Sequence, residues 1–266
     1  MFNILLARKQ QKHRTIPYPK EEPTLPDRFR GRPVLQHSAC VQNCASCIDA
    51  CPTNALNIHD ETLHLDMGRC LFCGACEEVC PQKAINFTND YRLATRQRED
   101  LILSREALPL AVALEKRILR LFGRSLRLRQ VSAGGCNACE ADLNVLSTVV
   151  FDIGRFGIQF VASPRHADGI VLTGPLTQNM LTAFMKTYEA IATPKLVIAV
   201  GACAISGGPY INHPQTNNGL SGFPNVDLFI PGCPPHPLTI LDGFLRLLGQ
   251  LDTQQNHPSS NNGVDK

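Results

Sequence analysis

The stretch Gly134-Gly135-Cys136-Asn137-Ala138-Cys139-Glu140 places two thiols three residues apart. Such a pair can reach one metal centre but does not complete its ligand set. Two further cysteines, Cys203 and Cys233, lie far downstream. A stretch that is typical of a buried strand precedes the first pair, and another precedes each of these two residues. Because the loops at the carboxyl ends of parallel strands gather on one edge of a sheet, we expect the four thiols to converge. Four thiolates are the ligand set of an iron–sulfur cluster or a structural zinc site.

The other eight cysteines form an internal repeat within residues 37–90. The run Cys70-x2-Cys73-x2-Cys76-x3-Cys80-Pro81 is that of a four-iron ferredoxin, in which the fourth cysteine ligates the other cluster. The upstream run Cys40-x3-Cys44-x2-Cys47-x3-Cys51-Pro52 repeats this pattern. Its last three cysteines correspond to the last three of the downstream run at a period of 29 residues. Two interlocked quartets, each followed by proline, favour iron–sulfur clusters over zinc.

Exchange of the fourth ligand gives each half-repeat three ligands for its own cluster and one for its neighbour. The predicted ligands of one cluster are Cys40, Cys44, Cys47 and Cys80. The predicted ligands of the other are Cys51, Cys70, Cys73 and Cys76. The first run has one residue more after its first cysteine than the second run has, which leaves the role of Cys40 open. Between the halves, apolar residues alternate around Asp60-Glu61, which predicts a short hairpin.

Apolar patterning from residue 126 onward alternates between strand-like and helical segments. The strand-like runs are Leu126–Val131, Gly157–Ala162, Gly169–Gly174, Lys195–Val200 and Asp227–Ile230. Amphipathic helical runs lie near 138–150, 178–192 and 237–249. This alternation predicts an α/β domain with a parallel sheet, joined to a small α+β dicluster ferredoxin-like domain.

Composition divides the rest of the chain. Residues 1–36 form a basic, Pro-rich extension, which we expect to be an extended arm. Residues 91–125 form a basic linker in which Leu108, Ala111 and Phe122 belong to a set of apolar residues at helical spacing, with Gly123 as the expected helix end. The parallel-sheet domain spans 126–252, and the polar residues 253–266 are expected to be disordered.

Charge and cysteine usage limit the partners and the compartment. The formal net charge is only +3, yet residues 1–36 and 92–129 are strongly basic, which indicates either an acidic partner or a membrane surface, or equally well solvated basic linkers. Aromatic residues are few and no nucleic-acid recognition module is visible, so nucleic acid is not an expected partner. The N-terminal apolar run is too short for a signal peptide, and no stretch approaches the ~20 apolar residues of a membrane span. Clustered thiols in a reducing cytosol argue for metal.

The segment Leu126–Leu251 resembles the small subunit of group 4 [NiFe] hydrogenases, which is similar to the cluster-bearing quinone-site subunit of respiratory complex I. The resemblance is carried by Gly135–Glu140, Ser163–Asp168, Thr173-Gly174-Pro175, Gly201-Ala202-Cys203 and Pro231–Pro235. Asn137-Ala138 separates the first two cysteines as in the hydrogenase branch, whereas the complex I branch has adjacent cysteines. The dicluster ferredoxin, usually a separate chain in formate hydrogenlyase-type complexes, is fused here at the N-terminus.

The resemblance implies a flavodoxin-like fold and a [4Fe-4S] cluster on Cys136, Cys139, Cys203 and Cys233. Together with the ferredoxin-like domain, this gives three [4Fe-4S] clusters. Implied partners are a hydrogenase large subunit (or a 49 kDa-like subunit of complex I), membrane-arm subunits and an electron-donor protein. The implied location is cytoplasmic, peripheral on the inner face of the cell membrane.

Four polar residues near the predicted third cluster have open roles. Glu140 either complements the charge of a helix N-terminus or takes part in proton transfer at the partner interface. Arg165 and His166 either tune the cluster, contact the large subunit or belong to an ordinary solvated loop, and Asp168 is expected to orient that loop.

The sequence therefore favours an electron-transfer subunit of a membrane-associated [NiFe] hydrogenase with no catalytic residue of its own. The alternatives are a cluster subunit of a complex I-like quinone oxidoreductase, a free-standing polyferredoxin carrier and a zinc-stabilised interaction module. The large α/β domain argues against the free carrier.

Overall fold

The computed structural model describes residues 2–12, 14–41, 44–104, 108–114, 116–122 and 125–251. The expected disordered tail, the end of the predicted linker helix at Gly123 and two residues of the Cys40–Cys44 loop lie outside these ranges.

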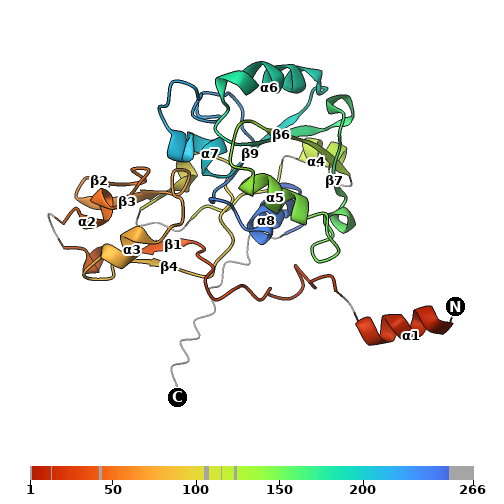
Figure 1. The fold of residues 1–266 in the computed structure, drawn as a ribbon, viewed down its shortest axis with the longest axis horizontal. Helices are drawn as coiled ribbons and strands as arrows, with labels where there is room; N and C mark the ends of the chain where they lie inside the picture. Colours follow the sequence, from red (N-terminus) through yellow and green to blue (C-terminus); the bar gives the residue numbers. More distant parts are fainter. Residues whose placement is uncertain are drawn as a thin grey trace.

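Within the described ranges, the C-terminal half forms a five-stranded parallel sheet (Figure 1). Its strands are β6 (Leu126–Ser132), β7 (Ile158–Phe160), β8 (Gly169–Thr173), β9 (Leu196–Val200) and β10 (Leu228–Ile230). The spatial order is β10-β9-β8-β6-β7, which is the flavodoxin-like order. The predicted parallel α/β domain and its flavodoxin-like fold are confirmed.

Helices cover both faces of this sheet, because successive strand residues point to opposite sides. Ile170 and Val197 belong to the same apolar cluster as Phe184 of α6 (Gln178–Ala190). Val171 and Ile198 belong to a second cluster, with α5 (Ala138–Val145) and α8 (Pro237–Leu247). Figure 1 accordingly shows α6 on one side of β6 and β9, and α5 and α8 on the other. A short helix that was not predicted from the sequence, α7 (Ala202–Ser206), follows β9.

The ferredoxin-like half consists of two equivalent βαβ units. The first contains β1 (Pro33–Leu35), α2 (Ser46–Asp49) and β2 (Leu56–His59), and the second contains β3 (Thr62–Asp66), α3 (Ala75–Val79) and β4 (Ile85–Phe87). Strand β1 pairs with β4 and β2 pairs with β3, as a pseudo-twofold repeat requires. A further strand, β5 (Ile102–Leu103), extends the second pair. Asp60 and Glu61 both have positive φ, which is typical of a two-residue hairpin turn and matches the predicted hairpin.

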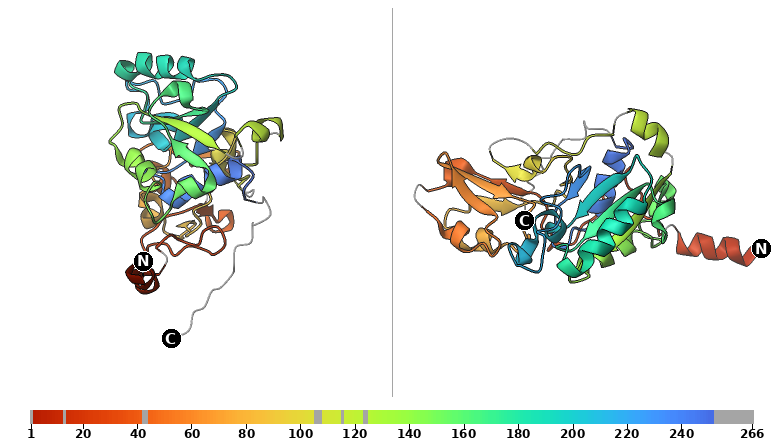
Figure 2. Two further views of the ribbon diagram at one scale, coloured as in Figure 1. Left: turned by 90° about the vertical axis from the view of Figure 1, so that its right-hand side faces the viewer. Right: turned by 90° about the horizontal axis from the view of Figure 1, so that it is seen from above.

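The two halves share one apolar core. The cluster that holds Ile170 and Phe184 continues into Leu65 and Met67 of the ferredoxin-like half. The Ser206 hydroxyl donates a hydrogen bond to the Gly68 carbonyl at 2.9 Å, which links α7 directly to the second repeat. The right-hand view in Figure 2 shows the ferredoxin-like half next to the half that contains the parallel sheet.

The N-terminal and linker segments differ from their expected conformations. Residues 1–36 contain a helix, α1 (Phe2–Gln11), which stands apart from the body in Figures 1 and 2, and the strand β1. The predicted linker helix is wrong over 108–114, and helix α4 spans only Lys116–Phe122. Residues 108–114 are instead an irregular segment that packs on the rest of the protein, and an apolar residue at every third position is compatible with that conformation. The Ala111 N–H donates to the Ala94 carbonyl, and the Leu114 N–H donates to the Leu247 carbonyl.

Helix α8 is buried along its whole length and carries an ion pair inside the core. Arg246 Nε donates to Asp242 Oδ2 at 2.8 Å, and the Tyr18 hydroxyl of the N-terminal arm donates to Asp242 Oδ1 at 3.0 Å. Arg246 and Asp242 are only 2% and 1% exposed, so each charge depends on the other.

We expect Arg246→Met to leave the Asp242 carboxylate buried without its cation. Such losses cost about 3–5 kcal/mol, which corresponds to a fall of roughly 10 °C in melting temperature for a chain of this size. Melting followed by circular dichroism measures the effect. The double variant Asp242→Leu/Arg246→Met removes both charges and is expected to melt closer to the unaltered protein. Equal losses in the single and double variants would contradict the dependence of the two charges on each other.

Candidate metal centres

The distal set is defined as Cys40, Cys44, Cys47 and Cys80, and these four thiols line one cavity. Burial raises the pKa of Cys47, and the neighbouring thiols of Cys40, Cys80 and Cys44 raise it further. Cys44 lies at the surface, where hydrogen bonding from Ser46 lowers its pKa. The structure thus brings together the four residues predicted for the first cluster, and the longer loop after Cys40 does not remove that residue from the cavity.

The middle set is defined as Cys51, Cys70, Cys73 and Cys76, and these thiols line a second cavity. Burial raises the pKa of Cys70 to about 12 and that of Cys76 to about 11, with added repulsion from the other thiols of the set. Cys51 comes from the first repeat and the other three from the second, an arrangement that the predicted ligand exchange requires.

The proximal set is defined as Cys136, Cys139, Cys203 and Cys233, and its thiols line a third cavity. The first two stand at the start of α5 after β6, Cys203 lies in α7 after β9, and Cys233 follows β10. The site thus lies at the carboxyl edge of the sheet, as parallel-strand geometry requires. Burial raises the pKa of Cys203 to about 12 and also raises that of Cys139, and the other thiols of the set add to both effects.

Gly201 makes room for the proximal set. Its φ is +89°, and a Cβ atom there would lie 2.5 Å from the Cys139 sulfur. Both the backbone conformation and the close approach therefore require glycine. This role was not predicted from the sequence, although the signal was present in a glycine that directly ends a buried strand, two residues before a predicted ligand.

Backbone N–H groups point at the sulfurs of the ferredoxin-like half in a repeated pattern. Ala55 N–H donates to Cys51 Sγ at 3.2 Å, and Ala84 N–H donates to Cys80 Sγ at the same distance. Phe72 N–H donates to Cys70 Sγ at 3.3 Å. Such donors stabilise thiolate over thiol and tune a metal bound there.

Burial and mutual repulsion oppose the simultaneous ionisation of the four thiols of one set, unless a positive charge lies between them. Iron–sulfur cores supply that charge to soft thiolate ligands, so the residues present fit [4Fe-4S] clusters in all three cavities. In the described part of the chain, no group of three or more His, Cys, Asp or Glu side chains has the geometry for a single metal ion.

The three sets follow one another in the order distal, middle, proximal. The Cys47 thiol of the distal set contributes to the raised pKa of Cys76 in the middle set. Cys73 of the middle set likewise raises the pKa of Cys233 in the proximal set. The middle set therefore lies between the other two.

Glu140 is the third residue of α5 and lines the proximal cavity, with only 5% of its surface exposed. The Thr173 hydroxyl at the end of β8 donates to Glu140 Oε1 at 2.7 Å, which holds the carboxylate beside the thiols. Thr173 was not predicted as a site residue, because nothing in its spacing from Glu140 indicates a contact.

Arg165 and His166 lie elsewhere. They belong to a short 3₁₀ helix, η4 (Pro164–His166), that directly precedes β8, and both are exposed. Neither is among the described residues that line the proximal cavity, because the thiols gather at the opposite, carboxyl end of the strands. Asp168 accepts a hydrogen bond from Arg127 N–H at 2.7 Å and so orients this loop.

Two family models match the chain. Residues 136–247 match the 20 kDa subunit of NADH ubiquinone oxidoreductase, and residues 28–84 match the 4Fe-4S dicluster domain. The C-terminal half is thus similar to a respiratory subunit, and the N-terminal half to an iron–sulfur domain.

Curated relatives match about half of this chain. A probable membrane-bound hydrogenase subunit of Pyrococcus furiosus is 43% identical over 141 residues, which cover 52% of this chain and 84% of the relative. Formate hydrogenlyase subunit 7 of Escherichia coli is 37% identical over 140 residues, covering 53% of this chain but only 55% of the relative. An NADH-quinone oxidoreductase subunit of Heliobacterium modesticaldum is 38% identical, covering 45% of this chain and 69% of the relative.

Among solved structures, a chain of the membrane-bound sulfane sulfur reductase, an archaeal respiratory membrane complex, is 31% identical. The match covers 53% of this chain and 78% of that chain, with a TM-score of 0.45.

We expect Gly201→Ala to remove the proximal cluster alone, because the added methyl group would collide with the Cys139 sulfur. Iron per chain should fall by about four atoms, the content of one [4Fe-4S] cluster. Colorimetric iron analysis after anaerobic purification measures the loss. The matched control is Gly222→Ala, since a Cβ atom at Gly222 meets nothing within 4 Å. Unchanged iron in Gly201→Ala would contradict a cluster held at this site.

Proposed function

Because the chain belongs to the 20 kDa subunit family of NADH ubiquinone oxidoreductase, we propose that it is the electron-transfer subunit of a multi-subunit, membrane-associated [NiFe] hydrogenase of the formate hydrogenlyase type. The observation that supports this function most directly is the series of three thiol sets. The transfer of electrons between two partner proteins requires a series of adjacent redox sites.

Three [4Fe-4S] clusters are the proposed cofactors, one on each set. When bound, each cluster takes up and releases one electron. The thiolates would hold the clusters, the N–H donors of Ala55, Phe72 and Ala84 stabilise the sulfurs, and the shared core buries Cys70 and Cys76 of the middle set. All twelve cysteines of the sequence belong to these sets, so a nickel–iron centre would reside in the large subunit.

The two ends of the series define the proposed partner surfaces. Cys40 at the distal end is exposed, and this end would face the electron-donor protein. Cys136 and Cys233 at the proximal end are also exposed, and this end would face the hydrogenase large subunit. Glu140, buried beside the proximal set, lies at the end that would meet the site of proton and hydrogen chemistry.

Attachment to the membrane is proposed to be peripheral, on the cytoplasmic face and through membrane-arm subunits and helix α1. In the described ranges, no helix has the length and apolar character to cross a membrane. Helix α1 exposes Ile4, Leu5 and Leu6 and carries Arg8 and Lys9 in its last turn. An isolated helix of this length is only marginally stable in water, so we infer that an anionic membrane surface covers it.

A second candidate is the cluster subunit of a complex I-like quinone oxidoreductase. The similarity to an NADH-quinone oxidoreductase subunit favours it, as does the family itself. Against it stands Asn137-Ala138 between the first two cysteines, a spacing that resembles the hydrogenase branch.

Metal analysis separates these two functions. The complex is isolated anaerobically through a tag on this chain, and we expect about twelve irons per chain from three [4Fe-4S] clusters together with stoichiometric nickel from the partner. Iron with bound quinone and no nickel would support the quinone oxidoreductase instead. Zinc in place of iron would reject both functions.

We expect Leu5→Asp to weaken the binding of this chain, purified without the membrane-arm subunits, to vesicles of anionic lipid, because a carboxylate on the exposed apolar part of α1 is repelled by anionic lipid headgroups. Sedimentation of the vesicles, followed by quantification of this chain in pellet and supernatant, measures the binding. Ile102→Asp is the matched control, since it alters an exposed apolar side chain of the ferredoxin-like half. Equal pellet fractions for the two variants would argue against a membrane role for α1.

A further inference from the structure

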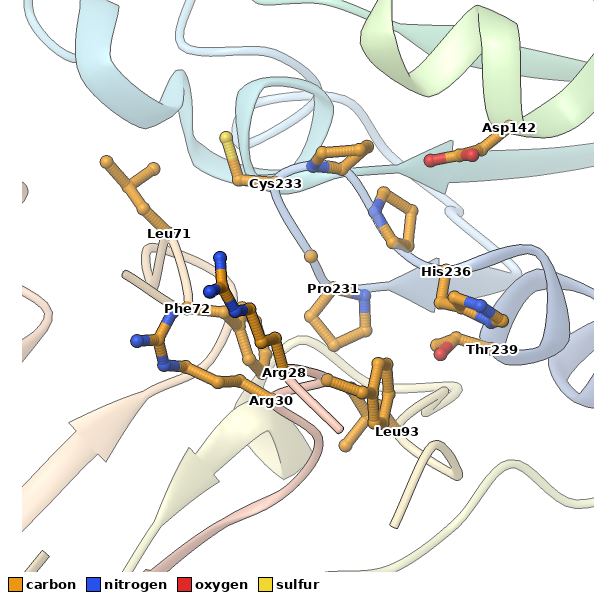
Figure 3. A pocket seen from close by; sticks show the side chains of 14 residues that line it. Arg28, Arg30, Leu71, Phe72, Leu93, Asp142, Pro231, Cys233, His236 and Thr239 are labelled. Carbon is orange, nitrogen blue, oxygen red and sulfur yellow. The ribbon is translucent and has the colours of Figure 1, made fainter. Parts of the chain in front are cut away.

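A cavity of about 250 Å³ lies at the junction between the middle and proximal sets. Figure 3 shows the side chains around it, which come from several separate parts of the chain. The N-terminal arm contributes Arg28 and Arg30, the middle-set loop Leu71 and Phe72, and the proximal loop Cys233 and Pro234. The cavity is therefore bordered by loops that carry ligands of two different predicted clusters.

Both arginines are directed at this junction. In Figure 3 the Arg28 guanidinium points into the cavity, towards Leu71 and Cys233. The Arg30 guanidinium lies against Gly74, next to Cys73: a Cβ atom at Gly74 would be 2.7 Å from Arg30 Nε. Arg30 therefore lies against the loop that carries Cys73, a predicted ligand of the middle set.

Neither guanidinium has a carboxylate partner in the part of the chain that the structure describes. The next arginine of the arm, Arg32, forms an ion pair with Asp90 at 3.8 Å. Arg92 pairs with the same carboxylate at 2.7 Å. The guanidiniums of Arg28 and Arg30, which are both exposed residues, thus have no ion-pair partner in the described ranges and border a cavity that Cys233 also lines.

The backbone of the arm is fixed at this place. Gly31 N–H donates to the Thr88 carbonyl at 2.7 Å, and a Cβ atom at Gly31 would lie 2.2 Å from the Asp90 carbonyl oxygen. The Phe29 ring packs edge-to-face on His236 at the start of α8, with a centroid distance of 5.3 Å. Contacts on both sides of Arg30 therefore hold the two arginines at the junction.

We propose that Arg28 and Arg30 form a cationic bridge that raises the reduction potentials of the middle and proximal clusters relative to the distal cluster. This inference rests on the proposed function, since it requires clusters on both sets. Four thiolates outweigh the positive charge of an iron–sulfur core, so each site is anionic and becomes more so on reduction. A fixed cation nearby stabilises the reduced state most.

The guanidiniums themselves accept neither an electron nor a proton, and no bond changes. They alter only the free energy of adding one electron to the neighbouring site. Asp142 and His236 also line the cavity, where burial raises the pKa of Asp142 and lowers that of His236. The two guanidiniums outweigh the single Asp142 carboxylate, so the side chains that line the cavity carry a net positive charge. The distal set lies beyond the middle set, where screening weakens the effect.

Redox titration of the anaerobically isolated complex, followed by electron paramagnetic resonance, tests this inference. The variants are Arg28→Gln, Arg30→Gln, the double glutamine variant and the double lysine variant. The cluster signals are assigned with Cys47→Ser, Cys76→Ser and Cys203→Ser. We expect the glutamine variants to lower the midpoint potentials of the middle and proximal clusters and to leave the distal one unchanged. The lysine pair, which keeps the charge, should stay close to the unaltered protein.

The matched control is Arg127→Gln, which removes an exposed positive charge at the opposite, amino end of β6. Iron content shows that each variant keeps its clusters, and if the double glutamine variant loses iron, the same titration of the single variants decides. Unchanged midpoints with all three signals present would overturn the cationic bridge alone, as would an equal shift of all three clusters. Missing cluster signals in the unaltered protein would overturn the proposed function instead.

Discussion

The repulsion among buried thiolates is the constraint on which the rest of this structure depends. Each cavity gathers four sulfurs, and in every set burial and the neighbouring thiols raise the pKa of at least one of them. The fold must therefore hold the sulfurs together against their own charge until a positively charged core joins them. Three features of the structure contribute to this. Backbone N–H groups and the arginines of the arm lie where they stabilise negative charge, and Gly201 leaves room for the Cys139 sulfur.

Two architectures meet that constraint in different ways. In the ferredoxin-like half, the pseudo-twofold repeat delivers three thiols from one unit and the fourth from its partner, so neither site can form without both units. In the α/β half, strand ends deliver the thiols, and the parallel order of β6, β9 and β10 brings distant residues to one edge. The first solution is local in sequence. The second depends on most of the sheet, because Cys136 after β6 and Cys233 after β10 come to one edge only when β8 and β9 have paired between those two strands.

This difference explains how much could be predicted from the sequence. The repeat, the hairpin at Asp60-Glu61 and the five strands follow from spacing and apolar runs, which are local signals. The assumed linker helix failed over 108–114, because an apolar period near three does not separate a helix from an irregular segment packed on the body. The contact between Thr173 and Glu140 and the position of Arg28 beside Cys233 depend on tertiary packing, which no local spacing encodes.

The junction between the halves shows what fusion into one chain adds. Helix α7 carries Cys203 of the proximal set, and its last residue, Ser206, bonds the Gly68 carbonyl two residues before Cys70 of the middle set. A Cβ atom at Gly68 would lie 2.8 Å from the Ile205 side chain, so glycine allows the ferredoxin-like half to pack directly against this side chain of α7. A flexible tether would only raise the effective concentration of one domain near the other. Here the continuous core and this contact fix the separation of two thiol sets, and the arm places its positive charges between them. The fused chain is therefore best understood as one rigid scaffold for adjacent redox sites.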